Sequence, residues 1–181
     1  MTNAHARLRL RLAHPDDMPV LSALMDRAIG ELLQDFLPPE GVQASYEIMG
    51  LDTQLIADGT YFVVEDGDAI AGCGGWSRRA TLFGGDHSAG RDSALLDPKT
   101  DAARVRAMYT HPDHTRKGVG RIILDACETA ARAEGFSRVE MAATMGGVPL
   151  YRACGYHDIE PFEAVTSTGY RVPLIRMGKA L

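Results

Sequence analysis

Apolar positions recur with two different periods along the chain, and the change of period marks the expected elements. Alternation of apolar and polar residues from Leu8 to Leu12 predicts a strand, because successive side chains of a strand point to opposite faces. Apolar residues three and four apart instead predict amphipathic helices. The first such helix opens at Pro15-Asp16-Asp17, runs to about Leu33, and is ended by Pro38 and Pro39.

Two further helices and a hairpin are expected before the middle of the chain. The helices cover about Pro39 to Met49 and about Asp52 to Ala57. Thr60 to Glu65 and Ala69 to Trp76 read as the two strands of the hairpin, because the turn sequence Asp66-Gly67-Asp68 separates them. Residues 78–102 follow as a loop, and loops of that length in a compact domain are usually functional or disordered.

The most informative run, from Arg104 to Gly135, predicts a strand, a turn, a glycine-rich loop and a helix in that order. The β-like residues Val105 to Thr110 end at a proline, which disfavours continuation. The helix shows apolar residues at helical spacing, and Gly135 is a natural stop. On its outward face we expect i,i+4 pairs between Arg121 and Asp125 and between Glu128 and Arg132.

The loop of this run, Thr115-Arg116-Lys117-Gly118-Val119-Gly120-Arg121, suits a phosphate group. Its glycines let backbone N–H groups converge on an anion, and the helix behind them adds the positive end of its dipole. The three basic side chains add formal charge at the same place. Spacing excludes two other phosphate motifs: there is no GxxxxGK[ST] string, and Ile123 occupies the third glycine position of a Rossmann fingerprint.

This pattern resembles the GNAT superfamily of N-acetyltransferases, whose [Q/R]xxGx[G/A] signature binds the pyrophosphate of acetyl-CoA. Thr115 to Gly120 matches the signature, with Thr115 where the family has Gln or Arg. A second block follows the expected strand Arg138 to Thr144: Pro149 to Tyr156 is similar to the family's YxxxG[FY] segment. Two blocks in the family's order are more specific than one glycine loop.

The resemblance implies acetyl-CoA as co-substrate, with its binding core at about residues 103–156. The strand before the loop would bind the pantetheine arm, and the loop would bind the pyrophosphate. Thr144 stands nearest a position after the fifth strand where the family often carries asparagine. The implied cofactor-binding residues are Met108, Tyr109, Thr110, Thr115, Arg116, Lys117, Gly118, Val119, Gly120, Arg121 and Thr144.

Aminolysis of a thioester sets the chemistry that such a site must supply. The acceptor ammonium, with a pKa of about 10, must lose a proton before it attacks. The oxyanion then needs a donor, and the departing thiolate needs a proton. By the same resemblance, Tyr151 lies beside the thioester as the general acid. The base stays open among Glu31, Asp35, Asp86 and His87, because spacing does not choose among them.

By the resemblance, residues 1–181 form a single N-acetyltransferase domain of the α/β class. We expect about seven strands in a mixed sheet and about four helices, with the fourth and fifth strands splayed to admit the cofactor. Tyr156 to Val165 and Tyr170 to Lys179 read as a final hairpin, with Pro161 and Pro173 at edges or bulges. The long loop would fold over the acceptor side of the cleft.

Composition excludes several other classes of protein. A net charge of −5 and a pI near 5.6, with no basic stripe beyond Arg116 to Arg121, argue against nucleic-acid binding. The three cysteines lack CxxC spacing, and His111 and His114 read as solvated turn residues, so we expect neither a disulfide framework nor a metal site. No stretch approaches about 20 apolar residues, and Met1 to Arg11 shows no signal sequence, which favours a cytoplasmic protein away from membranes.

The sequence therefore predicts an acyltransferase that moves the acetyl group of acetyl-CoA to a primary amine of a small molecule or peptide, by direct attack in a ternary complex. The departures at Thr115 and Thr144 motivate an alternative, a non-catalytic acyl-CoA-binding sensor of the same fold. The acidic balance weakly favours cationic acceptors. The acceptor's identity stays open, as does a homodimer, which many members of the resembled family form.

Overall fold

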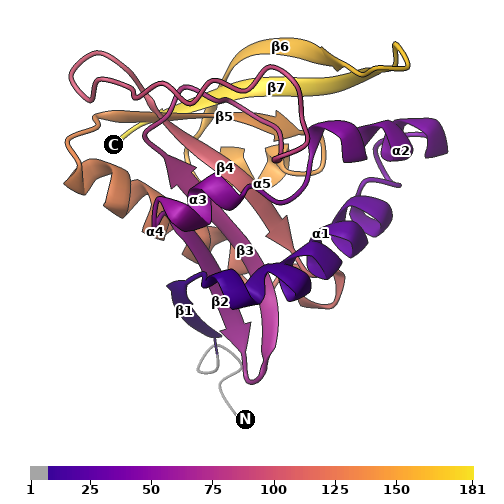
Figure 1. The fold of residues 1–181 in the computed structure, drawn as a ribbon, viewed down its shortest axis with the longest axis horizontal. Helices are drawn as coiled ribbons and strands as arrows, with labels where there is room; N and C mark the ends of the chain where they lie inside the picture. Colours follow the sequence, from indigo (N-terminus) through magenta and orange to yellow (C-terminus); the bar gives the residue numbers. More distant parts are fainter. Residues whose placement is uncertain (1–7) are drawn as a thin grey trace.

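One mixed sheet with helices on both faces makes up the part of the chain described by a computed structural model, residues 8–181 (Figure 1). The α/β class is therefore confirmed. The strands are β1 (Leu8–Leu12), β2 (Tyr61–Asp66), β3 (Ala69–Ser77), β4 (Ala103–Thr110), β5 (Arg138–Thr144), β6 (His157–Val165) and β7 (Arg171–Ala180). The helices are α1 (Met18–Leu32), α2 (Pro39–Ile48), α3 (Thr53–Ala57), α4 (Val119–Ala133) and α5 (Val148–Ala153), with short 3-10 turns η2 (Pro15–Asp17) and η3 (Pro112–His114).

Most element boundaries agree with the sequence-based prediction to within a residue or two. The strands β1 and β5 have the predicted ends. The first helix is divided into η2 and α1, because the side chain of His14 caps a 3-10 turn before the α-helix begins. The short α5 overlaps the family block from Pro149 to Tyr156, and it brings the helices to five among residues 8–181, where about four were expected.

The order of the strands is β1-β2-β3-β4-β5-β7-β6, and every neighbouring pair is antiparallel except β4 and β5. Within the described residues, β4 and β5 pair only at Ala103 with Val139 and at Arg104 with Glu140, near the start of both strands. The sheet is thus joined at its centre by a short parallel contact. The predicted splay of these two strands stays a prediction.

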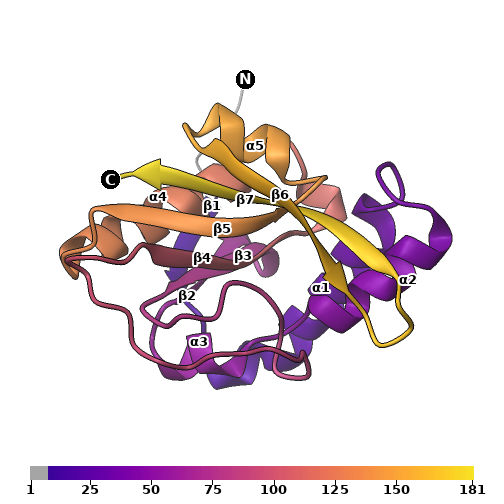
Figure 2. The ribbon, with the colours of Figure 1, turned by 90° about the horizontal axis from the view of Figure 1, so that it is seen from above.

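Helices cover both faces of the sheet (Figure 2), and the two larger apolar clusters lie beneath them, one on each face. On one face, α4 packs through Ile123 and Leu124 against the central strands, and Trp76 meets Phe136 edge-on at 6.1 Å between ring centroids. On the other face, α1 packs through Leu21 and Met25. The central strands are therefore buried on both faces, which is why β3 reads as a nearly continuous small and apolar run.

The expected outward pairs on α4 are wrong. Glu128 is buried and binds Lys179 of β7 at 2.7 Å between Oε2 and Nζ, while no pair with Arg132 forms in the described chain. Glu128 lies one turn after the fully buried Leu124, so it falls on the face of α4 that packs against the protein. Arg121 and Asp125 are both exposed and, within residues 8–181, likewise form no ion pair with each other.

Both strand prolines of the C-terminal hairpin lie where a missing N–H is tolerated. Pro161 is on β6, the edge strand of the sheet. Pro173 is on β7, one residue before Leu174. Leu174 and Thr144 form the last pair between β5 and β7, so within the described residues Pro173 lies past the end of that pairing. The predicted placement at edges or bulges is therefore confirmed for both prolines.

Residues 1–7 lie outside the described residues, so the expectation about a signal sequence in Met1 to Arg11 is not tested there. The single domain over residues 1–181 likewise stays a prediction. In the described part of the chain, the helices lack the combination of length and apolar character that a membrane span requires.

Candidate functional site

The glycine loop presents a row of backbone N–H groups at the start of α4. Gly118 is the N-cap residue, with φ 85°, and Arg116 also adopts a left-handed conformation, with φ 64°. These two residues turn the chain from η3 into α4. Among residues 8–181, the N–H groups of residues 116–121 donate to no backbone acceptor, and no side chain caps the helix. The loop therefore has the unsatisfied donors and the positive dipole end that an anion needs.

Close packing behind the loop keeps it in place. A Cβ atom on Gly120 would lie 2.5 Å from Cδ2 of Leu150 in α5, so this glycine allows α4 and α5 to approach. The side chain of Val119 is buried, and a Cβ atom on Gly72 of β3 would lie 2.5 Å from its Cγ1. Val119 and Gly120 can therefore offer a ligand only their backbone.

The side chains of Arg116, Lys117 and Arg121 surround this row of donors. All three are exposed, and within the described part of the chain none of them forms an ion pair. Thr115 behaves differently, because its hydroxyl donates to the carbonyl of Pro112 at 3.3 Å and so closes the preceding turn. The loop thus offers three uncommitted cations beside the helix N-terminus.

A cavity between β4 and β5 brings together several residues predicted for the site. Met108, Tyr109, Thr144 and Tyr151 line it, whereas Thr110 does not. The loop residues 115–121 lie outside this cavity, at the start of α4. The other lining residues are Ile48, Met49, Gly50, Leu82, Phe83, Gly84, Val105, Arg106, Ala107, Met141, Ala142 and Leu174.

A β-bulge in β4 decides which side chains face which side of the sheet. The register between β3 and β4 shifts between Cys73 and Gly75, and Ala107 has φ 51°. The extra residue leaves Met108 on the α4 face and places Tyr109 in the core against α1. The hydroxyl of Tyr61 donates to the carbonyl of Ala107 at 2.7 Å and holds the bulge. Sequence reasoning missed this feature because position 107 carries no glycine.

Tyr151 is a protonated donor at the cavity. Burial raises the pKa of its hydroxyl well above the ordinary value, so the group keeps its proton at neutral pH. A Cβ atom on Gly147 would lie 2.6 Å from Cε2 of Tyr151, so a glycine at this position lets the tyrosine ring pack directly against the backbone of residue 147. The hydroxyl has no hydrogen-bond partner within residues 8–181 and is available to a ligand.

The side chain of Tyr109 is already committed to the protein. Its hydroxyl accepts the N–H of Gly50 at 2.9 Å, and burial raises the pKa of the group. Gly50 lies at the end of the α2 segment, so this bond ties β4 to the chain that borders the cavity. Only the backbone of Tyr109 is left to contact a pantetheine arm.

The four candidate bases lie in different surroundings. Glu31 forms an ion pair with Arg27 at 2.8 Å, and Asp35 is exposed. Asp86 and His87 line a second cavity, between α1, α2 and the long loop, which shares Met49 and Gly50 with the first cavity. Asp86 accepts the N–H of Thr53 at 3.0 Å.

His87 has a defined tautomer. Its Nε2 lies 2.7 Å from the carbonyl oxygen of Tyr46, and a carbonyl can only accept, so Nε2 carries the hydrogen. In the neutral ring, Nδ1 then holds the lone pair. Nδ1 has no hydrogen-bond partner in the described chain.

The histidines of η3 are not the solvated residues that the sequence suggested. The side chains of His111 and His114 are 22% and 15% exposed, and their rings meet edge-on at 5.3 Å. His111 accepts the N–H of Asp113, and His114 lies 3.4 Å from the carboxylate of Asp66. In the described residues, no group of three or more potential metal ligands gathers here or elsewhere.

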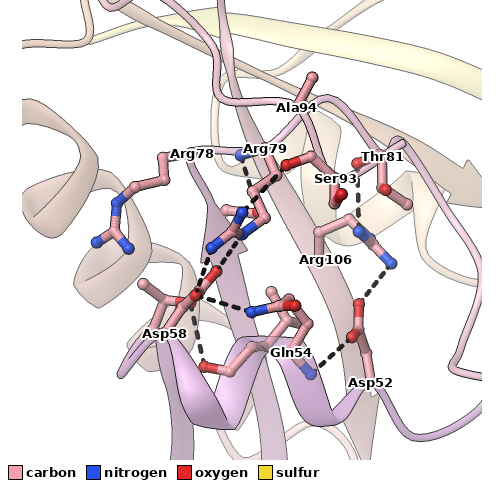
Figure 3. A network of polar contacts seen from close by, with 12 residues as sticks. Asp52, Gln54, Asp58, Arg78, Arg79, Thr81, Ser93, Ala94 and Arg106 are labelled. Atoms are coloured by element: carbon pink, nitrogen blue, oxygen red, sulfur yellow. Dashed lines mark hydrogen bonds and ion pairs between the residues drawn. The ribbon is translucent and has the colours of Figure 1, made fainter. Parts of the chain in front are cut away.

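A buried polar network borders the same cavity, and sequence reasoning did not find it (Figure 3). Arg106 of β4 is 3% exposed and donates to the carboxylate of Asp52 at 2.9 Å. Asp52 also caps α3 by accepting the N–H of Gln54. The signal available in the sequence was the position of Arg106 between the apolar residues Val105 and Ala107 of a predicted strand.

Comparisons with known proteins match the chain to one family. The chain matches the model of the family described as "Acetyltransferase (GNAT) family" over residues 26–156. It is 27% identical over 130 residues to the "Uncharacterized N-acetyltransferase YsnE" of Bacillus subtilis (strain 168), which covers 69% of this chain and 71% of that protein.

Solved structures show the same fold. A GCN5-related N-acetyltransferase from Rhodopseudomonas palustris is similar with a TM-score of 0.71 and 20% identity, covering 97% of both chains. The structure of yncA from Salmonella typhimurium, solved with its cofactor acetyl-CoA, is similar with a TM-score of 0.64 and 16% identity, covering 97% of this chain and 94% of that one.

Proposed function

We propose, from the premise that the chain belongs to the GNAT family of acetyltransferases, that it moves the acetyl group of acetyl-CoA to a primary amine of a small molecule or peptide. The observation that carries the proposal is the row of free N–H groups at residues 116–121, next to a cavity that holds a protonated tyrosine. The direct attack of the amine in a ternary complex is part of the proposal.

The residues present fit acetyl-CoA. The N–H groups of the loop and the cations of Arg116, Lys117 and Arg121 would bind the pyrophosphate. Since β4 and β5 pair only near their starts, backbone groups of Met108, Tyr109 and Thr110 that face β5 would bind the pantetheine arm. Thr144 borders the same cavity from β5.

Tyr151 is proposed as the general acid. The new bond forms between the amine nitrogen and the acetyl carbon, and the bond between that carbon and sulfur breaks. The hydroxyl of Tyr151 donates its proton to the departing thiolate; a tyrosine holds this proton at neutral pH, and burial, which raises its pKa, extends the protonated form to higher pH. The attacking nitrogen loses its second proton to solvent as the amide forms, and solvent restores the proton of Tyr151.

His87 is proposed as the base among the four candidates. The hydrogen bond from Nε2 to the carbonyl of Tyr46 leaves the lone pair on Nδ1. The cavity that His87 lines shares Met49 and Gly50 with the cavity that Tyr151 lines. Nδ1 would take the proton that the acceptor ammonium must lose before attack, directly or through a water molecule. Glu31 is a weaker candidate because it is paired with Arg27.

The experiment is a measurement of CoA thiol release from saturating acetyl-CoA across polyamines, amino acids, aminoglycosides, alkylamines and lysine peptides. We expect release with one amine class, slowed about a hundredfold in Tyr151→Phe, which is the usual contribution of a positioned acid. Tyr156→Phe is the control, because Tyr156 is a neighbouring buried tyrosine outside the cavity lining. Equal rates in wild type and Tyr151→Phe would remove Tyr151 from this role.

The alternative is an acyl-CoA-binding sensor, and one observation favours it: the hydroxyl of Thr115, at the position where the family has Gln or Arg, is engaged by the carbonyl of Pro112. The same assay separates the two. A sensor would gain thermal stability from acetyl-CoA and would release no thiol with any amine. The cytoplasmic location and the homodimer stay predictions.

A further inference from the structure

Arg106 fastens a segment of the long loop to the sheet. Its guanidinium donates through Nη1 to the carbonyl of Thr81 at 3.2 Å, and through Nη2 to the carbonyl of Gly84 at 2.6 Å and to Asp52 at 2.9 Å. Thr81, Arg106 and Asp52 are seen together in Figure 3. We call residues 81–84 the wall segment. Both of its ends are thus held by one buried side chain of β4.

A second set of contacts joins the wall segment to residues 91 and 92 of the same loop. Arg91 donates to Asp52 at 2.9 Å and to the carbonyl of Gly84 at 3.1 Å. The hydroxyl of Thr81 donates to the carbonyl of Asp92 at 2.7 Å. Asp52 therefore lies between two guanidinium groups, and the wall segment is bonded from both sides.

The wall segment borders the cavity on the face of the sheet that carries α2. Leu82, Phe83 and Gly84 all line the cavity, opposite Tyr151, which enters from the other face on α5. The ring of Phe83 lies 5.9 Å from that of Phe162 on β6. The segment thus spans from the network at α3 to the C-terminal hairpin, over the place where an acceptor would meet the thioester.

The side chains that this segment adds to the cavity are apolar, whereas Arg106, Thr144 and Tyr151 contribute polar groups to the rest of its lining. Leu82 and Phe83 line the cavity together with Ile48, Met49 and Leu174. Arg106 also lines it, and its Nη atoms already donate to Asp52 and to the carbonyls of Thr81 and Gly84. Burial of apolar surface stabilises a bound group in proportion to its apolar area. A second ammonium at this wall would be buried near the Arg106 charge at a cost.

We propose that Arg106 is a positioning residue that holds the wall segment, and that Leu82 and Phe83 so held select an amine with an apolar group next to its reacting nitrogen. This inference rests on the proposed function and goes beyond it, because it names the class of acceptor and the residues that choose it. It also replaces the weak preference for cationic acceptors that net charge suggested.

The wall is tested with ethylamine and hexylamine as acceptors, which differ only in apolar length. In the wild type, kcat/KM for hexylamine is expected to exceed that for ethylamine about tenfold or more, because each buried methylene adds affinity. Leu82→Ala and Phe83→Ala should reduce this ratio about fivefold. Leu95→Ala is the matched control, since Leu95 belongs to the same loop, is 68% exposed and does not line the cavity.

Two outcomes overturn the selectivity: a ratio near one in the wild type, or the wild-type ratio retained in both wall variants. If other amine classes release thiol and neither alkylamine does, the selectivity is wrong while acetyl transfer stands. If no amine releases thiol, the proposed function fails, and the inference about the acceptor fails with it.

The role of Arg106 is tested without any acceptor, by amide hydrogen exchange over residues 80–88 with and without acetyl-CoA. Arg106→Lys keeps the positive charge but loses the planar guanidinium that binds several acceptors at once. We expect amide exchange over residues 80–88 to accelerate about tenfold or more, while the exchange rates of the β6 and β7 amides stay unchanged. The double variant Asp52→Asn with Arg106→Gln is the second test. It keeps a side chain that can cap α3 and leaves neither position charged, so faster exchange in it cannot be attributed to unfolding caused by an unpaired charge at either position. Unchanged exchange in both variants would show that Arg106 does not hold the wall.

Where a reactive alkylamine is found, the same variants should raise its KM and leave the dissociation constant of acetyl-CoA unchanged. A purely structural role would instead change both constants together with the unfolding midpoint, and that result would overturn the assignment of Arg106.

Discussion

Lys179 binds Glu128 across the space between the last strand and the long helix, with 2.7 Å between Nζ and Oε2. The carboxylate is 8% exposed and the ammonium 27%, and the ammonium also lies 5.6 Å from the ring centroid of Tyr156. The second oxygen of Glu128 and the hydroxyl of Tyr156 are buried without partners among residues 8–181. Lys179 is therefore the charged partner of a carboxylate whose second oxygen is buried without one among residues 8–181.

Lys179→Met should destabilise the protein by about 2–3 kcal/mol, because it leaves the carboxylate of Glu128 buried without its charged partner. Urea unfolding measures the change. The double variant Lys179→Met with Glu128→Gln should recover part of the loss. A single variant as stable as the wild type would mean that water enters and solvates Glu128.

Gly118→Ala should lower both stability and acetyl-CoA affinity. Gly118 has φ 85° and open space around a Cβ atom, so the cost is backbone strain of about 1 kcal/mol and a shift of the loop donors. Gly169→Ala is the matched control, with φ 80° and open space in the turn between β6 and β7. Both variants should lose similar stability in denaturation, and only Gly118→Ala should weaken binding in calorimetry. Equal affinities would remove the loop from the cofactor site.

Lys117→Ala should reduce kcat/KM for acetyl-CoA about tenfold, because a charge-assisted hydrogen bond contributes roughly 1.5 kcal/mol. With acetylpantetheine, which lacks the pyrophosphate, the same variant should match the wild type. Lys99→Ala, at an exposed position of the long loop, is the control and should change neither value. A loss that persists with acetylpantetheine would place Lys117 at another part of the cofactor.

The activity should show no alkaline loss from Tyr151 up to about pH 10. Burial raises the pKa of this hydroxyl, and a raised pKa moves deprotonation to higher pH, so the acid form persists where an ordinary tyrosine would begin to ionise. The measurement is kcat against pH for the wild type and for Tyr151→Phe. A wild-type decline centred near pH 9 that disappears in the variant would contradict the raised pKa.

The elements of the fold could be read from sequence because their signals are local. Pro15, Gly118 and Gly135 act within a turn of their own positions, and the apolar spacing of α4 needs only its neighbours. The order of these elements around the glycine loop was enough for the family resemblance, which the match over residues 26–156 confirms. The roles assigned to Tyr151 and to the loop residues stay predictions.

The errors fell where a residue's partner lies far away in the chain. Glu128 was expected to face Arg132 one turn away, but its side chain turns toward Lys179, 51 positions later. Helical spacing tells which residues share a face and not which face is covered, and the contact with β7 decided that. The burial of His114 against Asp66 has the same origin.

The sequence by itself determined most helices and strands and the glycine loop with its three cations at the start of α4, because these depend on residues within a few positions of one another. Tertiary structure alone decided the bulge at Ala107, the approach of Tyr151 to the cavity, and the buried bond between Asp52 and Arg106, which are 54 positions apart. The physical reason is that burial and pairing depend on which surfaces meet after folding, and no local pattern specifies the partner.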